Sequence, residues 1–375
     1  MSTATRRVRK GFNHVDEAMR EALLGALESR NYYLGPENEA FEAELANSIG
    51  VRHAVAVNSG TSAMMLILRA LGIGPGDEVI VPAMGFVTLA EAVAVVGATP
   101  RFADVEEQTF NLEPDQAAAA ISEKTRAIVP AHKYGHPAEM GRLKALAERH
   151  GVYLLEDFCH ALGAQHQGQY VGGIGAAGFV SFAGKTISVC GLGGMVTTNN
   201  DDLAQEVRLL RDHGRPRAKG QRFYEIHRVG YNLRLSELHA AVGRVQLRRI
   251  EEWNQRRREN AALYNRLFAE RGLPVVTPQT LPGCTHAFLH YTLRVPEGRR
   301  DALQKFLADA GVESTVLYPQ DLHLLPPYQA LCGHREGDFP VSERLTREVL
   351  SLPNHPDVNP EDIQAVVDGV ERFYG

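Results

Sequence analysis

The first part of the chain alternates between short apolar runs and longer stretches with helical periodicity. Between residues 13 and 30, apolar side chains recur at every fourth position among charged ones, which predicts an amphipathic helix that packs on one face. Residues 53–57 form a short apolar run ending in Asn58-Ser59-Gly60-Thr61-Ser62, and residues 63–71 again have helical periodicity. This order predicts a strand, a loop and a helix.

The same alternation recurs further along the chain. The apolar runs are 78–81, 127–130 and 152–155, and the helical stretches after the first two are 86–96 and 140–150. Short β-branched runs separated by helices predict βαβ units, and therefore an α/β fold with a mainly parallel central sheet flanked by helices. Ligands of such sheets bind at the carboxyl ends of the strands, so we expect the chemistry in the loops that follow them.

The pattern changes near residue 251. An Arg-rich helical stretch is followed by a Pro-containing segment, an alternating run at 290–295, a helix at 300–310 and a last helix after Pro360. We therefore expect a large domain of residues 13–250 and a smaller C-terminal α+β domain of residues 251–375. A length of 375 residues, divided by about 150 residues per domain, also suggests roughly two domains.

Composition and charge narrow the function classes. Hydrophobic residues make up 44% and charged residues 23%, which is typical of soluble globular proteins. A net charge of -5 provides no basic field for nucleic acid, and no apolar run approaches the roughly 20 residues that span a bilayer. The first residues lack the apolar core of a secretory signal, and the four cysteines include no CxxC pair. We expect a cytoplasmic protein without nucleic-acid or membrane partners.

Three strand-end loops carry the groups that an aldehyde cofactor with a phosphate and a pyridine ring requires. Such a cofactor needs an amine, an acid for its ring nitrogen and backbone N–H groups for its phosphate. The loop at 59–62 is the phosphate candidate, Asp157 is the acid and Lys185 is the amine. Each of them also has an ordinary structural explanation when it is taken alone. The loop could be a turn that caps a helix, Asp157 a helix cap or a surface ion pair, and Lys185 a surface lysine. Their order, each at its own strand end, favours the cofactor site.

Two other motifs have simpler interpretations. Residues 173–178 match GxGxxG, but a dinucleotide site needs a helix after the motif, and residues 179–182 have the pattern of a strand. His132 and His136 have the spacing of metal ligands on a helix, but Tyr134-Gly135 between them indicates a loop. We therefore expect no dinucleotide or metal site.

Several segments in order resemble the DegT/DnrJ/EryC1/StrS family of sugar aminotransferases, over nearly the whole chain. The resemblance implies a fold type I transferase that depends on pyridoxal 5'-phosphate (PLP). The segments are Leu34-Gly35-Pro36-Glu37, Asn58-Ser59-Gly60-Thr61-Ser62-Ala63, residues 74–82, residues 134–140, residues 230–237 and residues 350–356.

The resemblance also implies roles for single residues and a homodimer whose active sites are shared between two chains. Lys185 matches the Schiff-base lysine and Asp157 the acid at the ring nitrogen. The remaining matches are Gly60, Thr61, Ser62 and Ser181 at the phosphate, Phe86 on the pyridine face, His160 at the phenolic oxygen, Asn232 at the phosphate of the neighbouring subunit, and Tyr318 and His323 at the substrate.

The chain departs from the family pattern at three positions. His160 stands where glutamine is common, two residues rather than three separate Phe182 from Lys185, and Leu192 replaces an acidic residue. These departures concern the geometry of the lysine and the choice of amino donor more than the identity of the cofactor, because no other lysine stands in that loop.

The implied reaction is transamination from an amino acid, glutamate or glutamine, to a keto sugar carried on a nucleotide, with the pyridoxamine phosphate (PMP) form between the two half-reactions. Relatives that dehydrate keto sugars carry histidine at the position of Lys185, so lysine there favours transamination. The alternatives are a PLP- or PMP-dependent sugar dehydratase or epimerase, an aminocyclitol aminotransferase, and a noncatalytic PLP-binding regulator.

Overall fold

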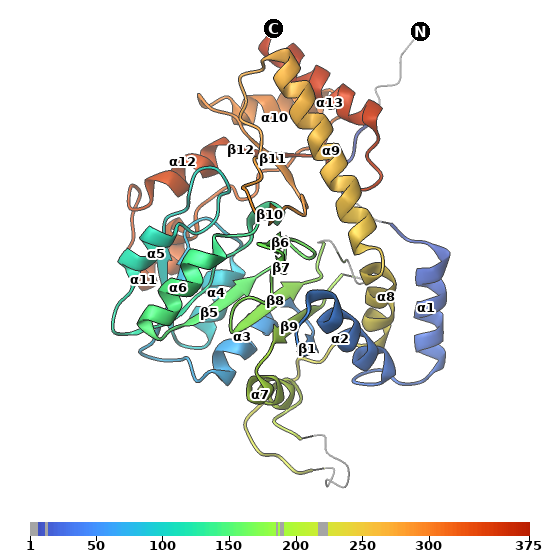
Figure 1. Ribbon diagram of the computed structural model, residues 1–375, viewed down its shortest axis with the longest axis vertical. Helices are drawn as coiled ribbons and strands as arrows, with labels where there is room; N and C mark the ends of the chain where they lie inside the picture. Colours follow the sequence, from blue (N-terminus) through green and yellow to red (C-terminus); the bar gives the residue numbers. More distant parts are fainter. Residues whose placement is uncertain (1–6, 12–13, 185–186, 188–190, 217–223) are drawn as a thin grey trace.

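A computed structural model describes residues 7–11, 14–184, 187, 191–216 and 224–375 (Figure 1). Lys185, the predicted Schiff-base residue, lies outside the described residues. Within the described part of the chain, no helix is both long enough and apolar enough to cross a membrane.

A seven-stranded sheet forms the centre of the molecule, in the order β1-β9-β8-β5-β4-β2-β3 (Figure 1). β9 pairs antiparallel with both of its neighbours and every other pair is parallel, so β9 alone runs against the rest of this sheet. The predicted mainly parallel sheet is confirmed. The strands are β1 (His53–Val57), β2 (Glu78–Pro82), β3 (Thr99–Ala103), β4 (Thr125–Ile128), β5 (Tyr153–Asp157), β8 (Ala177–Ser181) and β9 (Gly194–Thr198).

Both faces of this sheet are buried, because successive residues of a strand point to opposite faces. In β1, Val55 and Val57 belong to one apolar cluster, while Ala54 and Ala56 belong to another on the other face. Helices of the same part of the chain contribute apolar side chains to the cores around the sheet. They are α1 (Glu17–Glu28), α2 (Pro36–Ile49), α3 (Gly60–Ala70), α4 (Thr88–Val95), α5 (Pro114–Ala120), α6 (Met140–His150), α7 (Asp201–Arg211) and α8 (Glu237–Leu247).

The C-terminal part has a separate apolar cluster, built on the long helix α9 (Ile250–Arg271) and the antiparallel pair β11 (Tyr291–Arg294) and β12 (Val349–Leu352). α9 contributes to two cores: Trp253 packs against the sheet domain, whereas Tyr264 packs in the C-terminal cluster. The other elements are η1 (Lys133–Gly135), β6 (Gln165–His166), β7 (Gln169–Tyr170), β10 (Cys284–Thr285), α10 (Arg300–Asp309), η2 (Leu322–Leu324), α11 (Pro326–Cys332), α12 (Pro340–Glu348) and α13 (Pro360–Tyr374).

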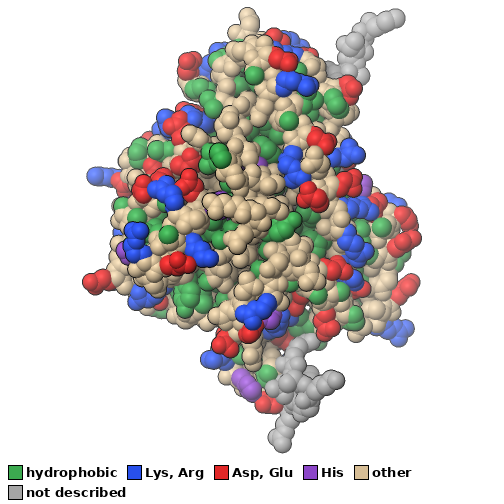
Figure 2. Space-filling model, viewed as in Figure 1, with side chains coloured by type: hydrophobic (Ala, Val, Ile, Leu, Met, Phe, Trp, Pro, Cys, Tyr) green, Lys and Arg blue, Asp and Glu red, His purple; other side chains and the backbone are tan. Residues whose placement is uncertain are grey.

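Charged side chains of both signs are interspersed over the face shown in Figure 2. This distribution agrees with the small net charge of -5, and it forms no continuous basic field on that face.

Candidate active site

The parallel strands place several loops at one edge of the sheet, where they enclose a cavity of about 370 Å³. Its walls come from the residues that follow β1, β2, β4, β5 and β8, as expected for a site at the carboxyl edge. The lining residues are Ser59, Gly60, Thr61, Phe86, Thr88, Ala131, His132, Lys133, Asp157, Cys159, His160, Ser181, Ala183, Leu192 and Tyr318.

The amino end of α3 forms one wall. Ser59 caps this helix, because its hydroxyl accepts the N–H of Ser62 at 3.1 Å. Gly60 allows the helix to approach β8, since a Cβ at this position would lie 2.6 Å from the Cβ of Ser181. The positive end of the helix dipole and the nearby Thr61 and Ser181 therefore lie at the cavity, which suits a phosphate group.

Asp157 lies at the end of β5, on the cavity. Its backbone pairs with the segment that follows β4: the Asp157 N–H donates to the carbonyl of Pro130, and the Asp157 carbonyl accepts the N–H of His132. Its Oδ1 accepts the N–H of Cys159 at 3.0 Å. Among the described residues Asp157 makes no ion pair, so its carboxylate can face a protonated pyridine nitrogen. Such a partner favours the ionised carboxylate and the protonated ring together.

Aromatic side chains form another part of the cavity wall, which includes Phe86, His160 and Tyr318. The ring of His160 lies parallel to those of Tyr134 and Tyr318, at centroid distances of 6.4 and 6.5 Å. Burial, and then the negative charge of Asp157, raise the pKa of Tyr318 well above its ordinary value. The Tyr318 hydroxyl therefore stays protonated at neutral pH, 3.4 Å from Nε2 of His160. Phe86 is 51% exposed, with its ring centroid 5.8 Å from that of Tyr318.

Lys133 also lines the cavity, and sequence reasoning missed it. This side chain is 3% exposed, and its Nζ lies 5.2 Å from the centre of the Tyr318 ring. Its backbone N–H donates to Oδ1 of Asn111 at 2.8 Å, which fixes the turn η1 that carries it. The available signal was its place just after the apolar run at 127–130, at the same sheet edge as Asp157. Thr88 and Cys159 were missed in the same way.

The structure does not bring every predicted residue to this cavity. Ser62 is not among the lining residues. The Ser59 hydroxyl accepts the backbone N–H of Ser62 and donates to the Ser62 hydroxyl. Asn232 accepts from Arg234 at 2.6 Å and lies outside the lining. His323 is fully buried beside Glu343, at 3.2 Å, where burial lowers its pKa.

The two motifs set aside from the sequence have structural roles. The fully buried Glu156 accepts N–H groups from the GxGxxG segment, at 2.7 Å from Ile174 and from Gly175, and strand β8 begins at Ala177, inside the motif. His132 donates from Nε2 to Glu156, because its Nδ1 accepts the N–H of Ala138. In the parts of the chain that the structure describes, no three His, Cys, Asp or Glu residues gather as they do around a metal ion.

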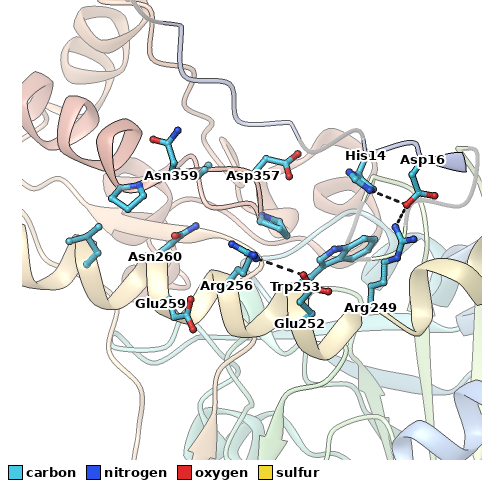
Figure 3. Close-up of a pocket in the computed structure, with 14 residues that line it drawn as sticks. His14, Asp16, Arg249, Glu252, Trp253, Arg256, Glu259, Asn260, Asp357 and Asn359 are labelled. Atoms are coloured by element: carbon cyan, nitrogen blue, oxygen red, sulfur yellow. Dashed lines mark hydrogen bonds and ion pairs between the residues drawn. The ribbon is translucent and has the colours of Figure 1, made fainter. Parts of the chain in front are cut away.

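A larger cavity of about 780 Å³ lies elsewhere, between α9 and the loop before α13 (Figure 3). Several of its charged groups pair with one another: Asp16 binds Arg249 and His14, and Arg256 lies beside Glu252. Burial alone would raise the pKa of Asp16, but the hydrogen bond from Arg249 and that from the Met19 N–H outweigh it and lower the value to about 2. None of the predicted site residues lines this cavity.

Comparison with known proteins agrees with this geometry. Residues 13–371 match the model of the DegT/DnrJ/EryC1/StrS aminotransferase family. The chain is 40% identical to a pleiotropic regulatory protein of Geobacillus stearothermophilus, over 96% of this chain and 93% of that protein. It is 40% identical to the dTDP-3-amino-3,4,6-trideoxy-alpha-D-glucose transaminase of Streptomyces venezuelae, over 94% and 91%.

Among solved structures, S. venezuelae DesV in complex with a ketimine intermediate is similar, with a TM-score of 0.89 and 39% identity over 95% of this chain and 94% of that one. A ketimine joins the PMP form of the cofactor to a keto substrate. The close approach at Gly60 and the carboxylate of Asp157 fit the phosphate and the ring nitrogen of this cofactor. The chain therefore belongs to the DegT/DnrJ/EryC1/StrS family of sugar aminotransferases and is a PLP-dependent enzyme.

Proposed function

We propose that this enzyme moves an amino group from glutamate or glutamine to a keto sugar carried on a nucleotide. The observation that carries the proposal is the gathering of Gly60, Asp157 and Ser181 around one cavity at the carboxyl edge of the sheet. The names of similar proteins give support, since they include a dTDP-sugar transaminase, a UDP-sugar 3-aminotransferase and a GDP-perosamine synthase.

When bound, PLP supplies an aldehyde carbon and a ring that accepts electrons. In this proposal Asp157 holds a proton on the pyridine nitrogen, and the loop at 59–62 and Ser181 bind the phosphate. Phe86 covers one face of the ring, and His160 lies at its phenolic oxygen. Lys185 holds the cofactor and moves a proton at the substrate carbon.

The substrate side of the cavity is assigned to Tyr318, Lys133 and His323. The protonated hydroxyl of Tyr318 can donate a hydrogen bond to a substrate oxygen. Lys133 adds a cation close to that ring, which suits substrates with carboxylate or phosphate groups. His323 is buried and does not line the cavity, so it would influence the substrate only by positioning the segment that carries Tyr318.

We further infer two domains, residues 13–250 and 251–375, and a homodimer in which Asn232 serves the site of the other chain. The separate apolar cluster of the C-terminal part supports the division. The position of Asn232 outside the cavity of its own chain supports the shared site. Exposed apolar side chains before, on and after α1, among them Val15, Leu24 and Tyr33, offer a surface for the second chain.

A two-step assay tests the proposed reaction. The purified protein is loaded with PLP, and its visible spectrum is followed as glutamate or glutamine is added. We expect conversion to the PMP spectrum, and then return to the PLP spectrum with an amino product when a keto sugar nucleotide is added. Formation of a dehydrated sugar would instead identify a dehydratase, and a spectrum that no donor changes would identify a noncatalytic regulator.

Variants test the residue assignment in the same assay. Lys185→Ala should abolish both the PLP–lysine absorbance and turnover, whereas Lys144→Ala, an exposed lysine on α6, should change neither. Borohydride reduction followed by peptide mapping should label the peptide that contains Lys185. A label on Lys133, which lines the cavity, would overturn the assignment.

A further inference from the structure

Arg257 is a buried cation on α9 that the proposed reaction does not use. Its side chain is 2% exposed. One guanidinium nitrogen, Nη1, donates to Oδ1 of Asn254 at 3.0 Å, and Nε has no acceptor among the described residues. Burial lowers the pKa of Arg257 to about 10, so the group still carries its charge at neutral pH.

Other buried arginines in the described part of the chain have a carboxylate beside them. Arg211 pairs with Glu42, and Arg300 pairs with Asp301. Arg257 has no such pair among the described residues, and the residues outside them contain no Asp or Glu in the sequence. A buried charge without a counter-charge costs several kcal/mol. An anion bound in a neighbouring cavity would supply a counter-charge.

Arg257 lines a cavity of about 380 Å³ that can receive such a group. The wall also includes Lys10, Thr315, Asn354 and His355, which are polar or cationic. Its one acidic residue, Glu313, is held at the wall by Arg7 and by the backbone N–H of Lys10, at 2.9 and 3.2 Å. Cations and N–H donors thus outnumber acidic groups around the guanidinium.

This cavity adjoins the cofactor cavity. Gly184 lines the cavity at Arg257 and its chain neighbour Ala183 lines the cavity at Asp157, directly before Lys185 in the sequence. His290 also lines the cavity at Arg257, and its ring centroid lies 5.0 Å from that of His160. The two cavities therefore lie on either side of residues 183–184 and of the contact between His160 and His290.

We propose that the cavity at Arg257 is an anion-binding subsite, in which the guanidinium binds a carboxylate or phosphate group of a substrate. The inference rests on the proposed function, which supplies both kinds of group: the amino-acid donor carries carboxylates, and the nucleotide-linked acceptor carries a diphosphate. A planar guanidinium binds either group through paired hydrogen bonds.

The experiment compares Arg257→Met, Arg257→Lys and Arg256→Gln in the PLP-loaded enzyme. Arg256 is the matched control, because it directly precedes Arg257 on α9, is largely exposed, and lines the larger cavity beside Glu252 (Figure 3). Thermal unfolding is measured without a probe, with sodium glutamate and with thymidine 5'-diphosphate, at matched ionic strength. The two probes distinguish a donor carboxylate from an acceptor diphosphate.

We expect one probe to raise the Tm of the wild type and of Arg256→Gln, and not that of Arg257→Met. Without a probe, Arg257→Met should be at least as stable as the wild type, because it removes a buried charge that has no partner. Arg257→Lys should keep part of the response, since lysine keeps the charge and loses the planar fork.

Binding of that same substrate should weaken about 10- to 100-fold in Arg257→Met, measured in the matching half-reaction, with its maximal rate little changed. Failure of Arg257→Met to fold, or a lowered Tm with an unchanged probe response, would make Arg257 a structural residue and overturn the proposal. So would the absence of a wild-type response to both probes. If the probes act as expected but the two-step assay detects no amino transfer, the anion-binding subsite is supported and the proposed reaction is wrong.

Discussion

At Gly60, a missing side chain determines how near the amino end of α3 comes to β8. The Cβ of Ser181 occupies the space that any larger residue at position 60 would need. Gly194 has a similar place beside the backbone of Ser59, where an added Cβ would lie 2.5 Å from a carbonyl carbon. Two glycines therefore allow three backbone segments to meet at the proposed phosphate site.

Gly60→Ala should weaken PLP binding, because the added methyl group pushes α3 away from Ser181. We expect a loss of about 10-fold or more in cofactor affinity, on the order of one strong hydrogen bond to phosphate. The measurement is a titration of apoenzyme with PLP, followed by absorbance. Gly25→Ala is the control, since no atom lies within 4 Å of its added Cβ, and it should leave the affinity unchanged.

At the same scale, His136 links stability to pH. Burial lowers its pKa to about 4, from an ordinary value of 6.5. The unfolded chain therefore binds a proton at this residue below pH 6.5, while the folded protein resists it. Stability from the neutral ring is complete above pH 6.5 and is lost as the pH falls toward 4, by up to about 3 kcal/mol.

His136→Gln should flatten the decrease in unfolding free energy between pH 6.5 and 4, as measured by denaturant titration at several pH values. His150→Gln, at the exposed end of α6, should keep the wild-type slope. An unchanged slope in His136→Gln would show that its ring does not control this loss.

Among the elements, β5 joins the site to the rest of the sheet. Its penultimate residue, Glu156, is fully buried and accepts hydrogen bonds from His132 and from the backbone of residues 172–175. Each Glu156 oxygen receives two donors, so the loop before β8 is held against β5. Asp157, the next residue, points to the cavity.

Glu156→Gln should destabilise the protein, because an amide group replaces one oxygen and faces two donors. We expect the unfolding free energy to fall by about 2–4 kcal/mol, from two lost bonds to a charged group. Glu148→Gln, an exposed position on α6, should lie within about 0.5 kcal/mol of the wild type. Equal stability of the two variants in denaturant titration would contradict this role for Glu156.

The sequence pattern predicted the elements that follow simple periodicity. The strands near 53–57, 78–81, 127–130 and 152–155, and the helices near 140–150 and 300–310, are confirmed within a few residues. The reversed direction of β9 was not predictable, because pairing direction depends on contacts between distant segments.

At the site, residues that follow predicted strands line the cavity, whereas a residue carried by a turn was not anticipated there. Asp157 and Gly60 follow apolar runs directly, and both line the cavity. Lys133 was missed although it also follows an apolar run closely, because it lies in the short turn η1, which has no periodic pattern. The burial of His323 was equally unpredictable, because its partner Glu343 lies 20 residues further along.

At the scale of the whole molecule, the proposed homodimer can be tested by mixing two inactive variants. Lys185→Ala removes the amine of its own site, and Asn232→Ala removes a group proposed to serve the other chain. In a mixed dimer, one site combines both changes while the other has a native lysine and a native asparagine.

We expect the mixture, refolded together, to regain about a quarter of the wild-type activity, because half of random dimers are mixed and each has one intact site. Two Lys185→Ala chains refolded together provide the control and should remain inactive. No recovery in the mixture, with dimers confirmed by light scattering, would show that Asn232 acts within its own chain.

α9 begins in the core of the sheet domain at Ile250 and ends in the C-terminal core beyond Phe268. Because one unbroken helix takes part in both, loosening either core exposes apolar side chains of the same rod. Partial unfolding of one half is thereby penalised in the other, and the two halves should melt as one cooperative unit. Motions that admit a bulky sugar are then left to the surface loops around the cavity.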